Sequence, residues 1–227
     1  MRKFGLLLIV VAMLAFPLCA TAGIIGNVDL KASPSYPPNG YAYFSYPTGY
    51  NNWVLDYHVS INDGPWSEAF CVEGQDLTTA EVQYTLLTID ASLSTFGLTA
   101  LNFLEAAAVA DYFRNNYFNN NNYKAGAQLA VWESIFDTDF DLTAGAFRAS
   151  NEYSDEAVLI WDAVKYNIPA YSNTWALAVN PTIVSGQTVG NTPFQNYLVY
   201  NPVPIPGAIW LLGSGLLGLV AVRRRRK

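Results

Sequence analysis

The sequence has few basic residues, and most of them lie at its two ends. Only 12 of the 227 residues are Lys or Arg, and seven of these occupy the first three and the last five positions. The stretch between the ends therefore contains five basic residues and all 18 acidic residues, which gives it a net charge of about −13. Such a body repels nucleic-acid phosphates, and no basic stripe interleaved with aromatic residues is present. We therefore expect no nucleic-acid partner.

Cysteine and histidine are also scarce. Cys19, Cys71 and His58 are the only residues of these two types. Because Cys19 falls in a segment that we expect to be removed, the mature chain has one cysteine and one histidine. One residue of each type cannot fill the shell of a tetrahedral metal site. We predict neither a metal site nor a cofactor.

The N-terminus has the pattern of an export signal. Residues 1–22 start with Arg2 and Lys3, continue in an apolar run and end in Ala20-Thr21-Ala22. A positive start, a short apolar run and an A-x-A site are typical of a secretory signal peptide. We therefore predict that residues 1–22 are removed, together with Cys19, and that the body is exported.

The C-terminal segment 203–227 has three parts. They are the proline motif Val203-Pro204-Ile205-Pro206, the uncharged run Gly207–Val222 and the basic end Arg223-Arg224-Arg225-Arg226-Lys227. The run predicts a single transmembrane helix, and the arginines place its end in the cytoplasm. This order resembles the PEP-CTERM sorting signal, in particular the variant with a V-P-L-P-A motif. The resemblance implies an exosortase-type processing enzyme, an inner-membrane stage and then a cell-surface or extracellular location, alongside exopolysaccharide.

Residues 23–202 read as one ordered extracellular domain. Residues 53–61, a turn at 62–65 and residues 67–72 predict a β-hairpin, and strands return over 175–200. Residues 27–52 read as loops and short strands. Apolar periodicity predicts three helices, over 98–118, 125–136 and 155–166, with the Asn-rich tract at 115–122 ending the first. The expected fold is therefore α+β: a β-rich barrel or sandwich-like sheet interrupted by a helical section.

Two short strings in this body resemble the thioester-domain family of bacterial surface proteins. They are Phe70-Cys71-Val72-Glu73 and Gln128-Leu129-Ala130-Val131-Trp132, with Ala127 where the family often has Thr or Ser. The resemblance implies that the Cys71 thiolate is acylated by the Gln128 side chain, with loss of ammonia. Phe70 and Trp132 are then expected to pack around the bond and exclude water.

A thioester of this kind implies a function other than turnover catalysis. A nucleophile on a partner, such as a lysine amine, attacks the acyl group and frees Cys71, so each molecule attaches once. The expected target carries an amine or is an extracellular polysaccharide. The alternative is that Cys71 is a buried, inert residue. The protein is then a non-reactive exopolysaccharide-associated or carbohydrate-binding module, whose 15 Tyr and 6 Trp residues provide apolar faces with polar tips.

Three further chemistries remain open from the sequence. A base beside a thiol activates it, so Cys71 and His58 are a candidate catalytic pair. Asp137, Asp139 and Asp141 begin like a calcium loop, although Leu142 and Arg148 replace its Gly and Glu. Paired carboxylates for glycoside hydrolysis are a third alternative. The acidic residues near Cys71 in sequence are Glu68, Glu73 and Asp76.

Overall fold

The computed structural model describes residues 23–35, 41–44, 50–54, 56–72, 79–96, 98–149, 153–180 and 194–200. The predicted signal peptide at 1–22 and the predicted sorting signal at 203–227 lie outside these ranges, so both stay predictions. Within the described ranges, no helix combines the length and the apolar character that crossing a membrane requires.

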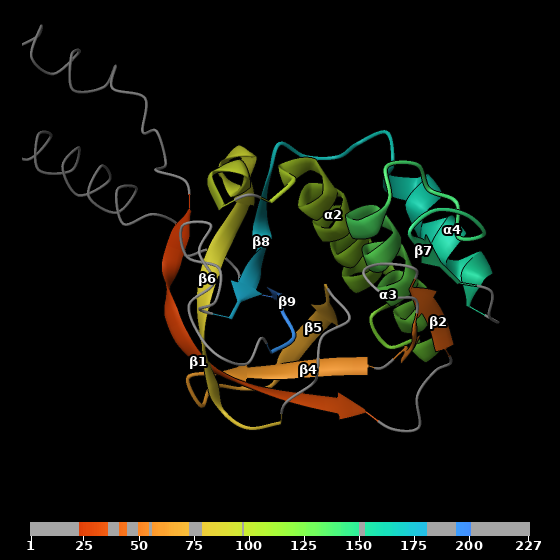
Figure 1. The fold of residues 1–227 in the computed structure, drawn as a ribbon. Helices are drawn as coiled ribbons and strands as arrows, with labels where there is room; N and C mark the ends of the chain where they lie inside the picture. The colour runs from red at the N-terminus through yellow and green to blue at the C-terminus, as the bar shows by residue number, and fades with distance from the viewer. Residues whose placement is uncertain are drawn as a thin grey trace, which may run out of the picture.

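Six antiparallel strands close into a β-barrel (Figure 1). Around the barrel the order is β1, β4, β5, β9, β8 and β6, and β6 pairs with β1 to close it. The strands are Ile24–Ser35 (β1), Asp56–Ile61 (β4), Ser67–Cys71 (β5), Val82–Asp90 (β6), Tyr171–Val179 (β8) and Tyr197–Tyr200 (β9). The predicted α+β class is confirmed, and the sheet is a closed barrel.

The hairpin of β4 and β5 forms where the sequence predicts it. Asn62 and Asp63 have φ angles of 50° and 55°, and the Gly64 N–H donates to the Ile61 carbonyl over 2.9 Å. Positive φ at both central residues is the type I′ geometry, whose twist matches that of paired strands. The turn therefore reverses the chain between β4 and β5, whose pairing runs from Val59 opposite Ser67 to Tyr57 opposite Ala69.

Three helices pack beside one another on one side of the barrel (Figure 1). They are α2 (Ala100–Tyr117), α3 (Asn121–Phe136) and α4 (Ser154–Val164), and the 3₁₀ helix η1 (Ala91–Phe96) precedes them. The prediction for α3 was wrong at its start, which lies four residues before residue 125. The Asn120 side chain accepts hydrogen bonds from the N–H groups of Asn122 and Tyr123, so it begins this helix as an N-cap.

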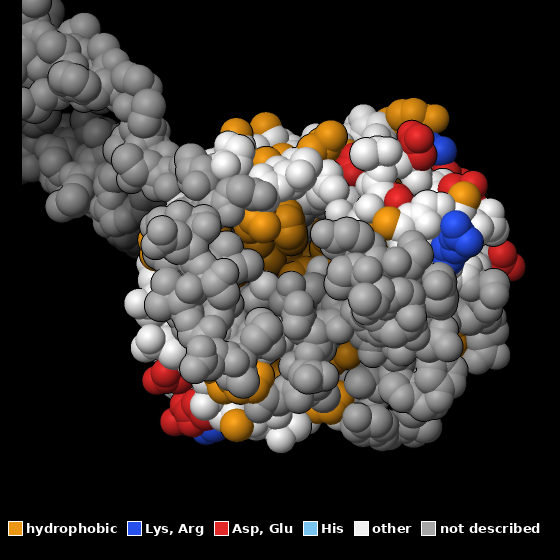
Figure 2. All heavy atoms as spheres, in the orientation of Figure 1, with side chains coloured by type: hydrophobic (Ala, Val, Ile, Leu, Met, Phe, Trp, Pro, Cys, Tyr) orange, Lys and Arg blue, Asp and Glu red, His pale blue; other side chains and the backbone are white. Residues whose placement is uncertain are grey.

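Polar and aromatic contacts join the helices to the barrel. Asp111 of α2 accepts hydrogen bonds from Trp175 Nε1 and Thr174 Oγ1 of β8, each at 2.9 Å. A smaller sheet has the order β3 (Tyr50–Trp53), β2 (Tyr41–Phe44) and β7 (Phe147–Arg148), and the Phe147 ring packs on Trp132 of α3. In Figure 2, hydrophobic side chains gather in a hollow between the barrel and α2, and acidic side chains lie towards the edges.

Sequence patterns missed part of the barrel. Most of β1 falls in residues that were predicted to be loops and short strands, and β6 was not predicted. β1 contains Gly, Asn, Asp and Pro, which are rare in strands, but its main chain pairs with β4 on one side and β6 on the other. The single strand predicted at 53–61 spans the end of β3 and all of β4, which belong to different sheets. Whether these segments form strands, and in which sheet, is decided by pairing with residues that lie far away in the sequence.

Candidate functional site

Cys71 is the last residue of β5, and its side chain is fully buried. Successive residues of a strand face opposite sides of the sheet. The Phe70 ring faces the helices, where it packs on Phe113 of α2 and on Trp175, with centroid distances of 6.0 and 5.6 Å. The Cys71 thiol therefore points away from these rings, to the other side of the strand.

The side chain that meets the thiol belongs to Gln195. This residue is 1% exposed, and its Nε2 donates to Cys71 Sγ. Gln195 lies two residues before β9, the strand that pairs with β5 so that Tyr197 lies opposite Cys71. Because Nε2 is bonded to the carboxamide carbon, the contact brings the sulfur beside an acyl carbon.

Two tyrosines hold Gln195 in place. The Tyr197 hydroxyl donates to Gln195 Oε1 over 3.2 Å, and the Tyr84 hydroxyl donates to the Gln195 main-chain carbonyl over 2.9 Å. The Tyr197 ring also packs against Tyr57 and Tyr84, with centroid distances of 5.9 and 6.1 Å. All three rings are at most 1% exposed, so they surround the Cys71–Gln195 contact with an apolar wall.

Gln128 also contacts Cys71, but through the main chain. Its Oε1 accepts from the Cys71 N–H at 2.9 Å, and its Nε2 donates to the Cys71 carbonyl at 2.8 Å. The pairing of β4 with β5 ends at Tyr57 and Ala69. Gln128 therefore bonds the main-chain groups of Cys71 beyond the last paired residue of β4, which fixes the position of the strand end.

This geometry corrects the predicted role of Gln128. The sequence interpretation paired the acyl carbon of Gln128 with the Cys71 sulfur. In the structure α3 begins at Asn121, so Gln128 lies in the helix interior, where main-chain N–H groups bond to carbonyls four residues before them. Both ends of its carboxamide are engaged by the Cys71 main chain, and Gln195 takes the position at the sulfur.

Phe70 and Trp132 are both fully buried. Phe70 packs on the helix side of β5, which is opposite to the thiol. Trp132 lies one turn after Gln128 on α3 and packs on Phe147 with a centroid distance of 5.8 Å. Their ring contacts therefore support the strand and the helix that carry Cys71 and Gln128.

No protein-family model matches the sequence, and no curated protein matches it significantly. The fold is similar to the N-terminal domain of the Streptococcus pyogenes pilus tip adhesin Cpa, with a TM-score of 0.41 and 14% identity over 79% of this chain and 96% of that chain. It is also similar to the N-terminal thioester domain of fibronectin-binding protein SfbI from Streptococcus pyogenes, with a TM-score of 0.42 and 15% identity over 77% and 94%. Likenesses this distant carry no function to the present chain, so its chemistry must come from its own residues.

The structure does not bring His58 to Cys71. His58 pairs with Glu68 across the β4–β5 hairpin, and both line a pocket on the outer side of the barrel. Glu68 and Cys71 are three residues apart on one strand, so their side chains face opposite sides. The predicted alternative of a Cys71–His58 catalytic pair therefore has no support in this geometry.

Asp56, His58 and Glu68 place potential ligand atoms within 4.8 Å of one another, but Lys124 fills the site. Its Nζ lies 2.5 Å from Glu68 Oε1 and 3.5 Å from Asp56 Oδ1. An ammonium group in that place repels a metal cation. The cluster is therefore an ion-pair network, buried at Glu68 and Lys124, that ties α3 to the hairpin.

Two of the acidic residues of the calcium-like run bind their own loop. Asp137 accepts from the N–H groups of Ala146 and Phe147, each at 2.8 Å. Asp141 Oδ1 accepts from the N–H and the hydroxyl of Thr143 at 2.9 and 2.6 Å. These carboxylates stabilise the turn that follows α3. Of the acids weighed for glycoside hydrolysis, Glu73 and Asp76 lie outside the described residues.

Glu133 has a perturbed pKa near this loop. Desolvation raises the pKa of this carboxyl, a hydrogen bond from the Asp141 N–H lowers it, and the charges of Asp137 and Asp141 raise it, so that the pKa lies at about 7. Between pH 4.5, its ordinary pKa, and pH 7, the folded protein therefore holds a proton that the unfolded chain has lost. Stability falls as the pH rises through this window and is level above it.

We predict that Glu133→Gln removes this pH dependence. A glutamine keeps an acceptor for the Asp141 N–H but cannot ionise. The free energy of unfolding of the variant, relative to that of the wild type, should therefore rise by about 2 kcal/mol from pH 5 to pH 8. Urea unfolding at the two pH values measures the difference. Parallel pH dependences for both proteins would contradict the prediction.

Gln195 is the site residue that sequence reasoning missed. Its neighbours Asn196 and Tyr197 lie at the start of a recognisable strand, but nothing local distinguishes Gln195 from other glutamines. It becomes visible only through the barrel, where β9 inserts between β5 and β8 and brings residues 71 and 195 together.

Proposed function

We infer that this protein attaches covalently to a partner through a thioester between Cys71 and Gln195. The observation that carries the proposal is the buried contact of Gln195 Nε2 with Cys71 Sγ. A carboxamide and a thiol, held together and buried, are the two reactants that the bond needs. The surrounding rings of Tyr57, Tyr84 and Tyr197 then exclude water and protect the thioester from hydrolysis.

Bond formation is an acyl transfer within one chain. Cys71 Sγ attacks the Gln195 carboxamide carbon, negative charge develops on Oε1, and Nε2 leaves as ammonia with the thiol proton. The Tyr197 hydroxyl already donates to Oε1, so it is positioned to stabilise that charge. The fold supplies proximity, because the two groups are held together before reaction. Gln128 contributes by fixing the Cys71 main chain.

Attachment reverses the roles of the groups. An amine of the partner attacks the acyl carbon, the new amide bond forms, and Cys71 leaves as a free thiol. Each molecule reacts once, so the protein acts as a covalent tether and not as an enzyme. With the predicted signal peptide and sorting signal, this makes it an exported surface protein that is anchored in the inner membrane and then processed by an exosortase-type enzyme.

The intact mass of the denatured protein tests the proposal. We expect the wild-type mass to be lower than the calculated chain by one ammonia, and Cys71→Ala to have the calculated mass. Methylamine should add its own mass to the wild type and leave the variant unchanged. A wild-type chain with its full mass and a free thiol would refute the thioester.

We predict that Tyr197→Phe slows the reaction with methylamine by about 10- to 100-fold. The phenyl ring keeps the packing on Tyr57 and Tyr84, but the donor to Oε1 is lost, and removal of one such donor costs enzymes about 100- to 1,000-fold. The rate of mass gain after methylamine addition measures the effect. Tyr171→Phe, an exposed position on β8, is the matched control. Equal rates for Tyr197→Phe and the control would exclude the hydroxyl from the reaction.

A further inference from the structure

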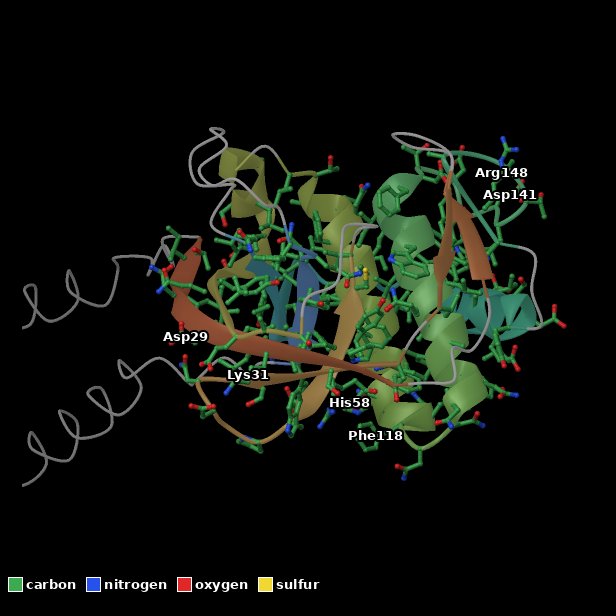
Figure 3. All side chains as sticks on the ribbon, turned by 60° about the horizontal axis from the view of Figure 1, so that its bottom comes forward. Asp29, Lys31, His58, Phe118, Asp141 and Arg148 are labelled. Carbon is green, nitrogen blue, oxygen red and sulfur yellow. The ribbon has the colours of Figure 1, made fainter. Side chains whose placement is uncertain are left out.

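A second candidate site lies on the outer side of the β4–β5 hairpin. A cavity of about 520 Å³ opens there, a volume within the roughly 300–1,000 Å³ of small-ligand sites. Its residues come from the hairpin, from the end of α2 and from the end of β9. Figure 3 shows two of them, His58 on β4 and Phe118 after α2, on the same side of the molecule. This cavity is separate from the Cys71 thiol.

Aromatic rings form the walls of the cavity. Trp66 and Phe118 are 55% and 50% exposed, which is high for residues of this size, and Tyr200 lies deeper. The Arg114 guanidinium stacks over the Tyr200 ring at 3.6 Å and lies 5.1 Å from the Phe118 centroid. The rings and the guanidinium therefore offer apolar faces and N–H donors side by side.

The floor of the cavity carries a carboxylate whose charge is already balanced. Glu68 is 5% exposed, Lys124 binds its Oε1 at 2.5 Å, and Arg114 lies 4.0 Å from its Oε2. No described residue donates a hydrogen bond to that Oε2. A buried acceptor without a donor costs free energy that a hydrogen-bond donor of a ligand can recover.

These charges select the class of ligand. A cationic group entering the cavity meets Arg114, and an anionic group approaches a body with a net charge of about −13. A neutral molecule with many hydroxyl groups avoids both penalties. Its hydroxyls can reach between Arg114 and Glu68, while its apolar ring faces pack on Trp66 and Phe118.

We propose that this cavity binds a neutral oligosaccharide chain. Sugar rings pack on the two exposed aromatic side chains, and hydroxyl groups bond to Arg114, His58 and the free lone pair of Glu68. The cavity holds the glycan reversibly. This binding does not depend on the thioester, because the two sites lie on opposite sides of β5.

Affinity electrophoresis in gels that contain a soluble polysaccharide tests the proposal. The protein carries Cys71→Ala, so that no covalent attachment contributes. The probes are the neutral polymers hydroxyethylcellulose, dextran, xylan and starch, with anionic alginate for comparison. We expect at least one of these neutral polymers to retard the protein. Trp66→Ala should weaken the retardation at least ten-fold, and Glu68→Gln should weaken it less, because a glutamine keeps an acceptor.

The matched control is Tyr166→Ala, which removes an exposed aromatic ring outside the cavity and should leave the retardation unchanged. Three results would overturn the proposal: no retardation by any of the four neutral polymers, retardation only by anionic alginate, or full retardation of Trp66→Ala. In protein that keeps Cys71, the ammonia loss reports on the Cys71–Gln195 site and not on the cavity. Trp66→Ala made in that protein should therefore still lose ammonia. The thioester proposal and the glycan-binding proposal are therefore tested independently, and refuting one does not refute the other.

Discussion

Gln195→Ala is expected to abolish the ammonia loss completely. Without its carboxamide, no acyl carbon lies at the sulfur, because the amide of Gln128 is bonded to the Cys71 main chain. The variant should have its calculated mass, keep a titratable thiol after unfolding and ignore methylamine. Mass spectrometry of the denatured protein, with and without methylamine, gives the answer directly.

Gln128→Ala is the decisive comparison. It removes two hydrogen bonds from buried main-chain groups, which costs about 1–3 kcal/mol for each group left unsatisfied. The melting temperature should therefore fall, but the folded protein should still lose ammonia. The opposite pattern, with ammonia loss kept in Gln195→Ala and absent from folded Gln128→Ala, would restore the pairing that the sequence favoured.

The two glutamines show what local sequence could and could not predict. The string around Gln128 marks a helix that docks on the Cys71 strand, and the structure confirms that contact. The chemical role depends on which atoms lie at the sulfur. That contact forms only when β9 pairs with β5 and brings in Gln195, which lies 124 residues after Cys71 in the sequence. Helices and the hairpin follow from short-range periodicity and turn residues, and were predicted. β1 and β6 depend on distant partners for their pairing, and were missed.

Lys124→Met is expected to destabilise the fold by about 3 kcal/mol. Lys124 is 3% exposed and pairs with Glu68, which is 5% exposed, so the substitution leaves a desolvated carboxylate without its nearest cation. Breaking a buried ion pair at one partner typically costs 3–5 kcal/mol, and Arg114 at 4.0 Å from Glu68 Oε2 places the effect at the lower end. Chemical denaturation of proteins that also carry Cys71→Ala measures it without the crosslink.

A double-mutant cycle separates the lost pair from lost packing. Adding Glu68→Gln to Lys124→Met removes the unpaired charge, so the double variant should recover at least 1 kcal/mol of the loss. Lys165→Met is the matched control, because its ion pair with Asp162 lies on the surface of α4, and its unfolding midpoint should stay close to wild type. Additive losses in the cycle would mean that the methylene chain of Lys124, and not its charge, holds α3. If the charge of Lys124 holds α3, the same ion pair also supports the proposed thioester site. Lys124 lies one turn before Gln128, and both side chains bond α3 to β5, the strand that carries Cys71.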